Sequence, residues 1–379
     1  MRIARTPLHR AAVLGAALSL SFVTACSAGN EAPAGGGANS APEITNEQGE
    51  ALSGTLNGAG ASTQEAAMGA WAAGFQTANQ GVRVNYDPVG SGGGRESFVS
   101  GGVDFAGSDA PLEDEELAAA QERCGGSVIE VPSYVSPIAL VFNLEGVDTL
   151  NLSPEAIAGI FAGEITQWDD EAIAADNPDA DLPSNPITPV HRADDSGTTE
   201  NFTEYLDAVA PDVWTFGIIE TWPLSGAKGG SAAQGTSGII DAVTNGANTI
   251  GYADASQAGD LSVVNVGVGS DFVAPSAEAA GKILEASPRV EGRDASDIVF
   301  ELDRQTQESG TYPVVLTSYI LACPEYDDQE TADLVKGYVG YVLSDAGQQT
   351  AAENAGSAPL PTSLQDEAAG IVENISASS

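Results

Sequence analysis

One ten-residue stretch of the chain brings together the residue types that bind oxyanions. Residues 191–200 read HRADDSGTTE, so Arg192 lies beside carboxylates, a serine, a glycine and two threonines. The residues that follow predict a helix at 199–209 with Ser196 as its N-cap. The backbone N–H groups of Gly197, Thr198 and Thr199 would then point out of the helix start without a partner, and they carry the positive end of the helix dipole. These amides, hydroxyl donors and one cation predict an oxyanion site.

Two other stretches share this pattern of a hydroxyl residue among glycines before a predicted helix. Ser62 and Thr63 follow a Gly-Ala-Gly-Ala segment, and Ser91 precedes three consecutive glycines. Each stretch has a simpler interpretation, because serine caps helices for stability alone at about 1 kcal/mol. The glycine run also fits a flexible turn. Three such helix starts together with Arg192 favour an anion site over three unrelated caps.

Two carboxylates refine the predicted site. Asp194 lies where it would hold the Arg192 guanidinium and leave its other donors for a ligand; the alternative for Arg192 is a solvated surface charge. Asp109 precedes Ala110 and Pro111 and, considered alone, is an ordinary turn residue. A carboxylate repels a bound anion unless it accepts a hydrogen bond from a protonated ligand oxygen. Phosphate keeps a proton near neutral pH and sulfate does not, so Asp109 in the site would favour phosphate.

Composition excludes several classes of function. The 379 residues hold 13 Lys and Arg against 54 Asp and Glu, a formal net charge of -41. This balance argues against a nucleic-acid partner, because such binding depends on basic contacts to phosphates. His191 is the only histidine beyond the first 25 residues, and no C-x-x-C motif is present. We therefore expect no zinc or iron–sulfur site and no cofactor.

The N-terminus has the features of an export signal. Residues 1–25 carry three arginines and then an apolar run at 11–23, which is too short to span a membrane. The residues Val-Thr-Ala before Cys26 resemble a bacterial lipobox, which implies that Cys26 is lipidated and becomes the mature N-terminus. The alternative is an ordinary signal peptide with an incidental cysteine. Residues 26–51 are rich in Gly, Ala, Asn, Glu and Pro, and we interpret them as a flexible tether.

From Leu52 onward, strand-like runs alternate with Ala-rich helical stretches, which predicts an α/β fold with ligand loops at the carboxyl ends of strands. The expected helices lie at 64–78, 95–100, 113–123, 153–162, 168–175, 199–209, 239–244, 277–286, 331–344 and 364–375. The expected strands lie at 82–86, 103–107, 128–131, 138–143, 250–253, 263–268 and 312–321. Lys228 lies in a glycine-rich segment at 226–237, and we assign it no ligand role.

Cys124 and Cys323 are the two cysteines beyond Cys26. An even pair in an exported chain favours a disulfide, which would stabilise the fold by about 2–4 kcal/mol. Two free buried thiols are the alternative.

Several of these segments resemble, in order, the phosphate-binding protein of bacterial high-affinity phosphate ABC transporters. The segments are GAGAS at 58–62, GSGG at 90–93, VDFAGSDAPL at 103–112, RADDSGT at 192–198, WDD with EAIA at 168–174, and IGY at 250–252. The resemblance extends from Leu52 to Ile375. It implies a type II periplasmic-binding-protein fold, with two α/β lobes joined by a two-strand hinge and phosphate bound in the cleft between them.

The resemblance also implies where the lobes divide. The hinge is expected to cross near 140–143 and to return near 312–315. Lobe I would then comprise 52–143 and 312–379, and lobe II would comprise 144–311. Both Cys124 and Cys323 fall in lobe I on this division, which favours the disulfide.

The same resemblance implies a ligand set for phosphate. Hydroxyl donors would come from Ser62, Ser91, Ser196 and Thr198, and backbone N–H donors from Thr63, Gly197 and Thr198. Arg192 would be the cation, tied to Asp194, and Asp109 would accept the hydrogen bond from the ligand's proton. One position departs from the family, which often has Thr-Phe where this chain has Ser62-Thr63. It is therefore open which of the two side chains contacts the ligand.

The implied function is a monomeric, lipid-anchored receptor at the extracytoplasmic face of the cell membrane. It would bind inorganic phosphate and deliver it to the permease and ATPase subunits of an ABC transporter, with no enzymatic activity. One alternative is a binding protein for another oxyanion, such as sulfate or molybdate, against which Asp109 argues. The other is an extracytoplasmic phosphatase with a serine nucleophile, against which the missing G-x-S-x-G motif argues.

Overall fold

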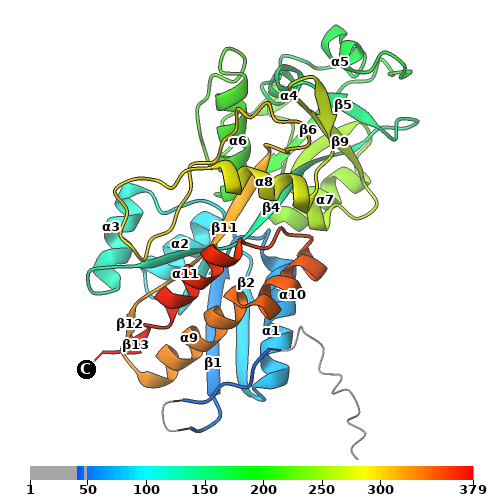
Figure 1. Cartoon of the computed structure of the whole chain (residues 1–379). Coiled ribbons are helices and arrows are strands. Elements are labelled where there is room, and N and C mark those ends of the chain that lie inside the picture. The colour runs from blue at the N-terminus through cyan, green and yellow to red at the C-terminus, as the bar shows by residue number, and fades with distance from the viewer. Residues whose placement is uncertain (1–40, 47–48, 379) are drawn as a thin grey trace, which may run out of the picture. The chain divides into compact units, whose positions relative to one another are not determined.

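Two antiparallel strands, β4 (Ile129–Asn143) and β11 (Val315–Ala322), occupy the middle of the strand order (Figure 1). The computed structural model describes residues 41–46 and 49–378, all within the compact unit Ala38–Ser379. β4 pairs with β11 along its first part, from Ile129 to Pro137, and with β8 (Thr249–Asp254) along its last part, from Ile138 to Asn143. One continuous strand therefore belongs to two groups of strands.

The first strand group consists of β11, residues 129–137 of β4, and three further strands. These are β1 (Ser53–Gly60), β2 (Gly81–Asp87) and β3 (Phe105–Ser108). β1 is parallel to both β2 and β3, and β3 is antiparallel to β11. The helices of this part are α1 (Glu65–Ala78), α2 (Ser91–Val99), α9 (Gln329–Leu343), α10 (Asp345–Ala355) and α11 (Thr362–Val372), and α3 (Asp114–Arg123) packs on α2.

The second strand group consists of residues 138–143 of β4 and the strands between β4 and β11 in the chain. Its strands are β5 (Leu150–Leu152), β6 (Thr188–Arg192), β7 (Ser231–Ala233), β8, β9 (Ser262–Val268) and β10 (Asp271–Val273). β6 is parallel to both β7 and β8. The helices of this part are α4 (Pro154–Phe161), α5 (Glu171–Asp176), α6 (Gly197–Val209), α7 (Gly235–Asn245) and α8 (Ala277–Ala286).

Three short elements complete the fold. They are the 3-10 turns η1 (Gly226–Lys228) and η2 (Ala255–Gln257), and a two-stranded sheet of β12 (Glu325–Tyr326) with β13 (Ser376–Ala377). In the part of the chain that the structure describes, no helix combines the length and the hydropathy needed to cross a bilayer.

The expected break between two strands at 128–131 and 138–143 was wrong, because β4 is continuous. The residues between them include two prolines and two serines, residue types that ordinarily mark turns. Their polar groups are satisfied inside the protein instead: the Ser133 hydroxyl donates to the Ser318 carbonyl at 2.8 Å, and the Ser136 hydroxyl to Asp254 at 2.5 Å. A buried polar group with a partner does not interrupt a strand.

The predicted start of the second helix was also wrong. α2 begins at Ser91, so the three glycines form its first turns rather than a flexible turn before it. Tertiary contact explains their use. A Cβ added at Gly94 would lie 2.3 Å from the Gly60 Cα, so α2 reaches β1 at this distance only without a side chain. This close contact overrides the low helix propensity of glycine.

Other elements were not predicted, among them the strands β1 and β6. The helix expected at 331–344 is followed at once by α10, which the sequence did not predict, and the Ser344 hydroxyl caps α10 through the Gly347 amide at 3.2 Å. The end of the expected tether contacts the body, since the Ile44 amide donates to Asn79 at 2.9 Å. The signal segment 1–25 and Cys26 lie outside the described residues.

The structure pairs Cys124 with Cys323 in a disulfide whose Cα atoms are 5.1 Å apart. Cys124 follows α3 and Cys323 follows β11, so the bridge ties two segments of the first strand group that are 199 residues apart in the chain.

Candidate functional site

Arg192 is the last residue of β6, and its side chain is only 2% exposed. Its Nε donates to Asp194 Oδ1 at 2.9 Å, and its Nη2 contacts the other oxygen of the same carboxylate. Its Nη1 donates to the Thr198 hydroxyl at 3.1 Å. The predicted hold of Asp194 on the guanidinium is therefore present, and it turns the remaining N–H groups toward the start of α6.

The start of α6 supplies amides and hydroxyls next to Arg192. Ser196 is the N-cap, as predicted, and its Oγ accepts from the Thr199 amide at 3.2 Å. The expectation that the Thr199 amide is free was therefore wrong. The amides of Gly197 and Thr198 belong to the first turn, where no intrahelical acceptor exists. The Ser196 hydroxyl still has its own O–H to donate to a ligand.

Gly197 lets α6 approach residues of the first strand group. A Cβ at this position would lie 2.7 Å from the Ser91 Oγ and 3.0 Å from the Asp109 Cβ. Ser91 in turn accepts from the Asp109 amide at 3.1 Å. The two helix starts, at Ser91 and at Gly197, therefore meet around Asp109.

Asp109 is buried, and hydroxyl groups surround its carboxylate. The Thr63 hydroxyl lies 2.7 Å from both oxygens, the Ser318 hydroxyl 2.8 Å from Oδ1, and the Thr198 hydroxyl 3.5 Å from Oδ2. Burial raises the pKa of Asp109, although these hydroxyls and the Arg192 charge act in the opposite direction. A buried carboxyl held among hydroxyls beside one guanidinium is suited to pair with an oxyanion that carries a proton.

Ser62 contacts a further helix start, that of α7, which was not predicted to lie near the site. Its Oγ accepts from the Thr236 amide at 3.0 Å and lies 3.0 Å from the Thr236 hydroxyl, at the start of α7. The neighbouring Gly235 amide donates to Asp194 Oδ1 at 3.0 Å. The Gly-Thr-Ser run at 235–237 has the same hydroxyl-among-glycines pattern as the other stretches, so the signal was present in the sequence.

Asn201 and Ser318 were also missed, and the sequence carries no signal for them. Asn201, inside α6, donates to the Asp109 carbonyl at 2.7 Å and to the Gly197 carbonyl at 2.8 Å. Arg304 donates to Asn201 Oδ1 at 2.6 Å. Ser318 lies in the buried strand β11. Only the tertiary contacts identify their place beside Asp109.

His191 and Lys228 have no place in this arrangement. The His191 ring stacks on Trp222 with centroids 5.0 Å apart, and its Nδ1 lies 2.9 Å from the Arg192 carbonyl. Burial lowers the pKa of His191. Lys228 is exposed on η1. Within residues 41–46 and 49–378, no group of His, Cys, Asp and Glu is arranged to hold a metal ion.

The structure thus brings together predicted site residues from both strand groups. Those from the first part of the chain are Ser62, Thr63, Ser91 and Asp109, and those from the middle part are Arg192, Asp194, Ser196, Gly197 and Thr198. The set contains one cation, several hydroxyl and amide donors, and two carboxylates, of which Asp194 holds Arg192 and Asp109 lies among the hydroxyls.

Comparison with known proteins agrees with this fold. Residues 45–346 match the PBP superfamily domain. The chain is 34% identical over 375 residues to the phosphate-binding protein PstS2 of Mycobacterium bovis, a match covering 96% of this chain and 98% of that protein. It is 36% identical over 313 residues to phosphate-binding protein PstS3 of the same organism, covering 81% and 83% respectively.

Solved structures show the same fold. A high-affinity periplasmic phosphate-binding protein, PfluDING, superposes with a TM-score of 0.67 at 24% identity, covering 83% of this chain and 92% of that one. A phosphate-binding protein from Stenotrophomonas maltophilia gives a TM-score of 0.64 at 21% identity, covering 84% and 93%.

The fold and the extent of the first match define the class: the chain is a member of the PBP superfamily, the periplasmic-binding-protein fold. Within that class, the identity to the mycobacterial proteins over most of its length makes it a member of the PstS phosphate-binding protein family.

Proposed function

We propose that this protein binds inorganic phosphate outside the cytoplasmic membrane and delivers it to an ABC-type phosphate importer. One observation carries the proposal most directly. The hydroxyls of Thr63 and Thr198, from the two strand groups, both point to the buried Asp109, and Arg192 donates to Thr198 beside them. Donors, a cation and one acceptor at a single point match the chemistry of a partly protonated phosphate.

Each predicted ligand residue has a role in this proposal. Arg192, held by Asp194, neutralises the anion, and the amides of Gly197 and Thr198 add the positive end of the α6 dipole. Ser62, Thr63, Ser91, Ser196 and Thr198 supply the hydroxyl and amide donors. Asp109 accepts the hydrogen bond from the phosphate proton. Sulfate offers no such proton, so it would leave two negative charges facing each other in a buried site.

We further propose that the chain divides into lobe I, at 52–143 and 312–379, and lobe II, at 144–311. β4 changes its partner strand between Pro137 and Ile138, N-terminal to the expected crossing at 140–143. Rotation of the lobes about β4 and β11 would open and close the site, since ligand residues lie on both sides of this crossing. The proposed hinge therefore controls access to phosphate.

The proposed setting follows the N-terminal sequence and the family. Cys26 would carry the lipid that anchors the protein to the outer face of the cell membrane. The partners would be the permease and ATPase subunits of the transporter, and the receptor would act as a monomer.

The phosphatase alternative receives no support from the site. The one histidine in the region is His191. Its Nδ1 lies against the Arg192 carbonyl, and its ring stacks on Trp222. A serine nucleophile needs a base within hydrogen-bond reach.

Calorimetric titration with phosphate tests the proposal, using protein first freed of phosphate by unfolding and refolding. We expect the unmodified protein to bind one phosphate, and Arg192→Gln to lose at least about 100-fold in affinity, because a buried charge-assisted contact is removed. Arg123→Gln is the matched control. Arg123 donates to the Val103 carbonyl away from the site, so the control loses the same charge and keeps its phosphate affinity. Absence of binding by the unmodified protein would overturn the proposed function.

A further inference from the structure

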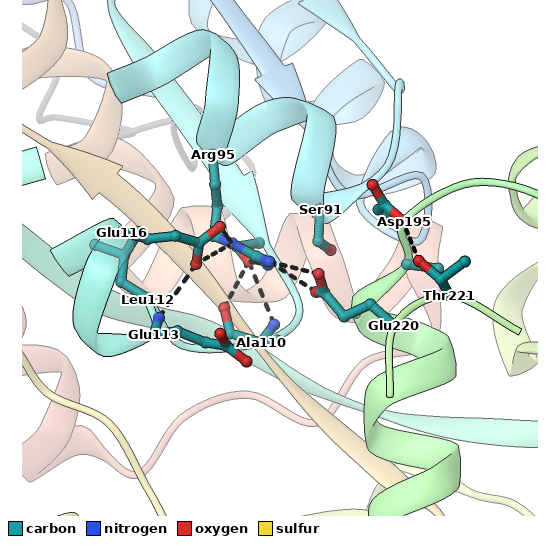
Figure 2. A network of polar contacts seen from close by, with 12 residues as sticks. Ser91, Arg95, Ala110, Leu112, Glu113, Glu116, Asp195, Glu220 and Thr221 are labelled. Atoms are coloured by element: carbon teal, nitrogen blue, oxygen red, sulfur yellow. Dashed lines mark hydrogen bonds and ion pairs between the residues drawn. The ribbon is translucent and has the colours of Figure 1, made fainter. Parts of the chain in front are cut away.

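Arg95 is a second buried arginine near the site, and the proposed phosphate contacts do not use it. It lies on α2, the helix that begins with Ser91, and its side chain is 2% exposed. Figure 2 shows its guanidinium between Glu116 on one side and Glu220 on the other. Arginine is rarely this buried unless it is paired, so the partners of Arg95 indicate its role.

Arg95 makes one set of contacts with residues of the first strand group and its helices. Its Nε donates to both oxygens of Glu116, on α3, at 2.9 Å. Its Nη1 donates to the Ser108 hydroxyl at 3.1 Å. These contacts orient the guanidinium and leave Nη2 directed away from the first strand group.

On the other side, Nη2 donates to both oxygens of Glu220, at 2.8 and 2.7 Å. Glu220 belongs to the segment between α6 and η1, 125 residues further along the chain, and its side chain is 22% exposed. Burial alone would lower the pKa of Arg95, but Glu220 and Glu116 outweigh it and raise that pKa. The guanidinium therefore stays charged and bridges the two parts of the chain.

The segment that carries Glu220 also contacts the start of α6. The Ser196 amide donates to the Glu220 carbonyl at 3.4 Å, and the Thr221 hydroxyl donates to Asp195 at 2.5 Å (Figure 2). The Gly92 amide, next to Ser91, donates to the Asp195 carbonyl at 3.3 Å. The ion pair thus lies where the helix starts at Ser91 and Ser196 meet. We call this junction between α2 and the segment around Ser196 and Glu220 the seam.

A neighbouring carboxyl, that of Glu200, also interacts with Glu220 and Arg95. Burial, followed by the charge of Glu220, raises the pKa of Glu200, while Arg95 acts in the opposite direction. With a pKa of about 9, Glu200 is protonated near neutral pH, so removing the Arg95 charge would leave the carboxylates of Glu116 and Glu220 without the guanidinium between them. Like charges at this separation repel, so the two sides of the seam would separate more readily.

We infer that Arg95 and Glu220 form a positioning pair that fastens α2 to the segment after α6 when the site is closed, and that this pair sets how long phosphate stays bound. The inference rests on the proposed function. Neither residue is part of the proposed ligand set. The pair acts through Ser91 and Ser196, whose hydroxyls it holds on opposite sides of the same site.

Stopped-flow measurement of phosphate association and release tests the pair. We expect Glu220→Gln to raise the release rate by about tenfold or more while the association rate changes by less than about threefold, because a contact formed on closing mainly affects release. Arg95→Gln should have the same effect, and the double variant should add little to either single change.

Glu116→Gln is the matched control. It also removes a carboxylate from Arg95, but Glu116 lies on α3, on the same side of the seam as Arg95. We expect its release rate to stay within about threefold of the unmodified protein. An equal increase in Glu116→Gln and Glu220→Gln would mean that Arg95 only supports the local fold, and it would overturn the inference.

The outcomes separate this inference from the proposed function. If the unmodified protein binds phosphate and Glu220→Gln releases it at the unchanged rate, the positioning pair is refuted and the phosphate site stands. If the unmodified protein does not bind phosphate, the proposed function itself fails. Should Arg95→Gln not fold, Glu220→Gln still decides the question, because Arg95 keeps its contacts to Glu116 and Ser108 in that variant.

Discussion

At the scale of single residues, Asp254 shows how burial alone changes a carboxyl group. It ends β8, is 1% exposed, and accepts the Ser136 hydroxyl at 2.5 Å and the Ser256 amide at 2.9 Å. Desolvation raises the pKa of Asp254 to about 6, although these hydrogen bonds oppose the shift; the Asp109 charge adds to it. Ser136 lies on β4 beside the proposed hinge, so this carboxyl is part of the crossing.

The raised pKa predicts a pH dependence of stability. A carboxyl whose pKa is higher in the folded state than in the unfolded state stabilises the protein below the unfolded value, and this contribution is lost as pH rises through about 6. Relative to Asp254→Asn, we expect the free energy of unfolding of the unmodified protein to fall by up to about 3 kcal/mol between pH 4 and pH 7. Urea unfolding across this range measures the difference.

Asp241→Asn is the control for this experiment, because it removes a carboxylate at an exposed position of α7. Its stability difference from the unmodified protein should vary little with pH. A pH-independent difference for Asp254→Asn as well would contradict the assignment of the raised pKa to Asp254.

Individual site residues were predictable where a local motif carries them. Arg192 with Asp194, and Ser196 with the start of α6, depend on neighbours in the chain, and the structure brings them together as expected. Asn201 lies inside a helix and Ser318 inside a strand, and no motif in either segment indicates a ligand site. Their positions beside Asp109 come from the packing of distant segments, which a short motif does not encode.

At the scale of elements, the contact between α2 and β1 places Ser91. Gly94 faces β1 so closely that an added Cβ would also lie 3.0 Å from the Ala59 carbonyl oxygen. The neighbouring helix α1 contains Gly69, where an added Cβ would meet no atom within 4 Å. Both glycines are helical, but only Gly94 lacks room for a side chain.

We expect Gly94→Ala to reduce the free energy of unfolding by about 1–3 kcal/mol, because the helix must move away from β1. Gly69→Ala should raise it by about 0.5–1 kcal/mol, since alanine favours a helix more than glycine does. Thermal or urea unfolding of the two variants measures both changes. A stabilised Gly94→Ala protein would show that α2 does not depend on this close approach.

Elements with strong periodicity were predicted well, and elements set by tertiary contact were not. α8 lies where it was expected, at 277–286, and α6 and α3 begin within a few residues of their predicted starts. The start of α2 and the continuity of β4 were missed because glycine, proline and serine ordinarily mark turns. In this fold, the same residues allow close packing or hydrogen bond across β4.

At the scale of the whole molecule, the net charge of -41 opposes the binding of any anion. The long-range field of such a protein repels phosphate, so capture depends on short-range donors in a buried site. Arg192 with its surrounding amides and hydroxyls supplies these donors, and Asp109 adds a selective repulsion. The α/β alternation was sufficient to predict an α/β fold, whereas the point at which β4 changes its partner strand, where we propose the hinge, emerged only from the strand pairing.

The central claim is that Asp109 makes this anion site selective for phosphate, and one measurement tests it most directly. Dissociation constants for phosphate and for sulfate are determined by calorimetry at pH 7, for the unmodified protein and for Asp109→Asn. We expect the unmodified protein to bind phosphate at least about 100-fold more tightly than sulfate, because the carboxylate rejects a ligand without a proton. In Asp109→Asn this ratio should fall by at least about tenfold, since the amide donates to sulfate as well. Comparable affinities for the two anions in the unmodified protein, or an unchanged ratio in Asp109→Asn, would contradict the account.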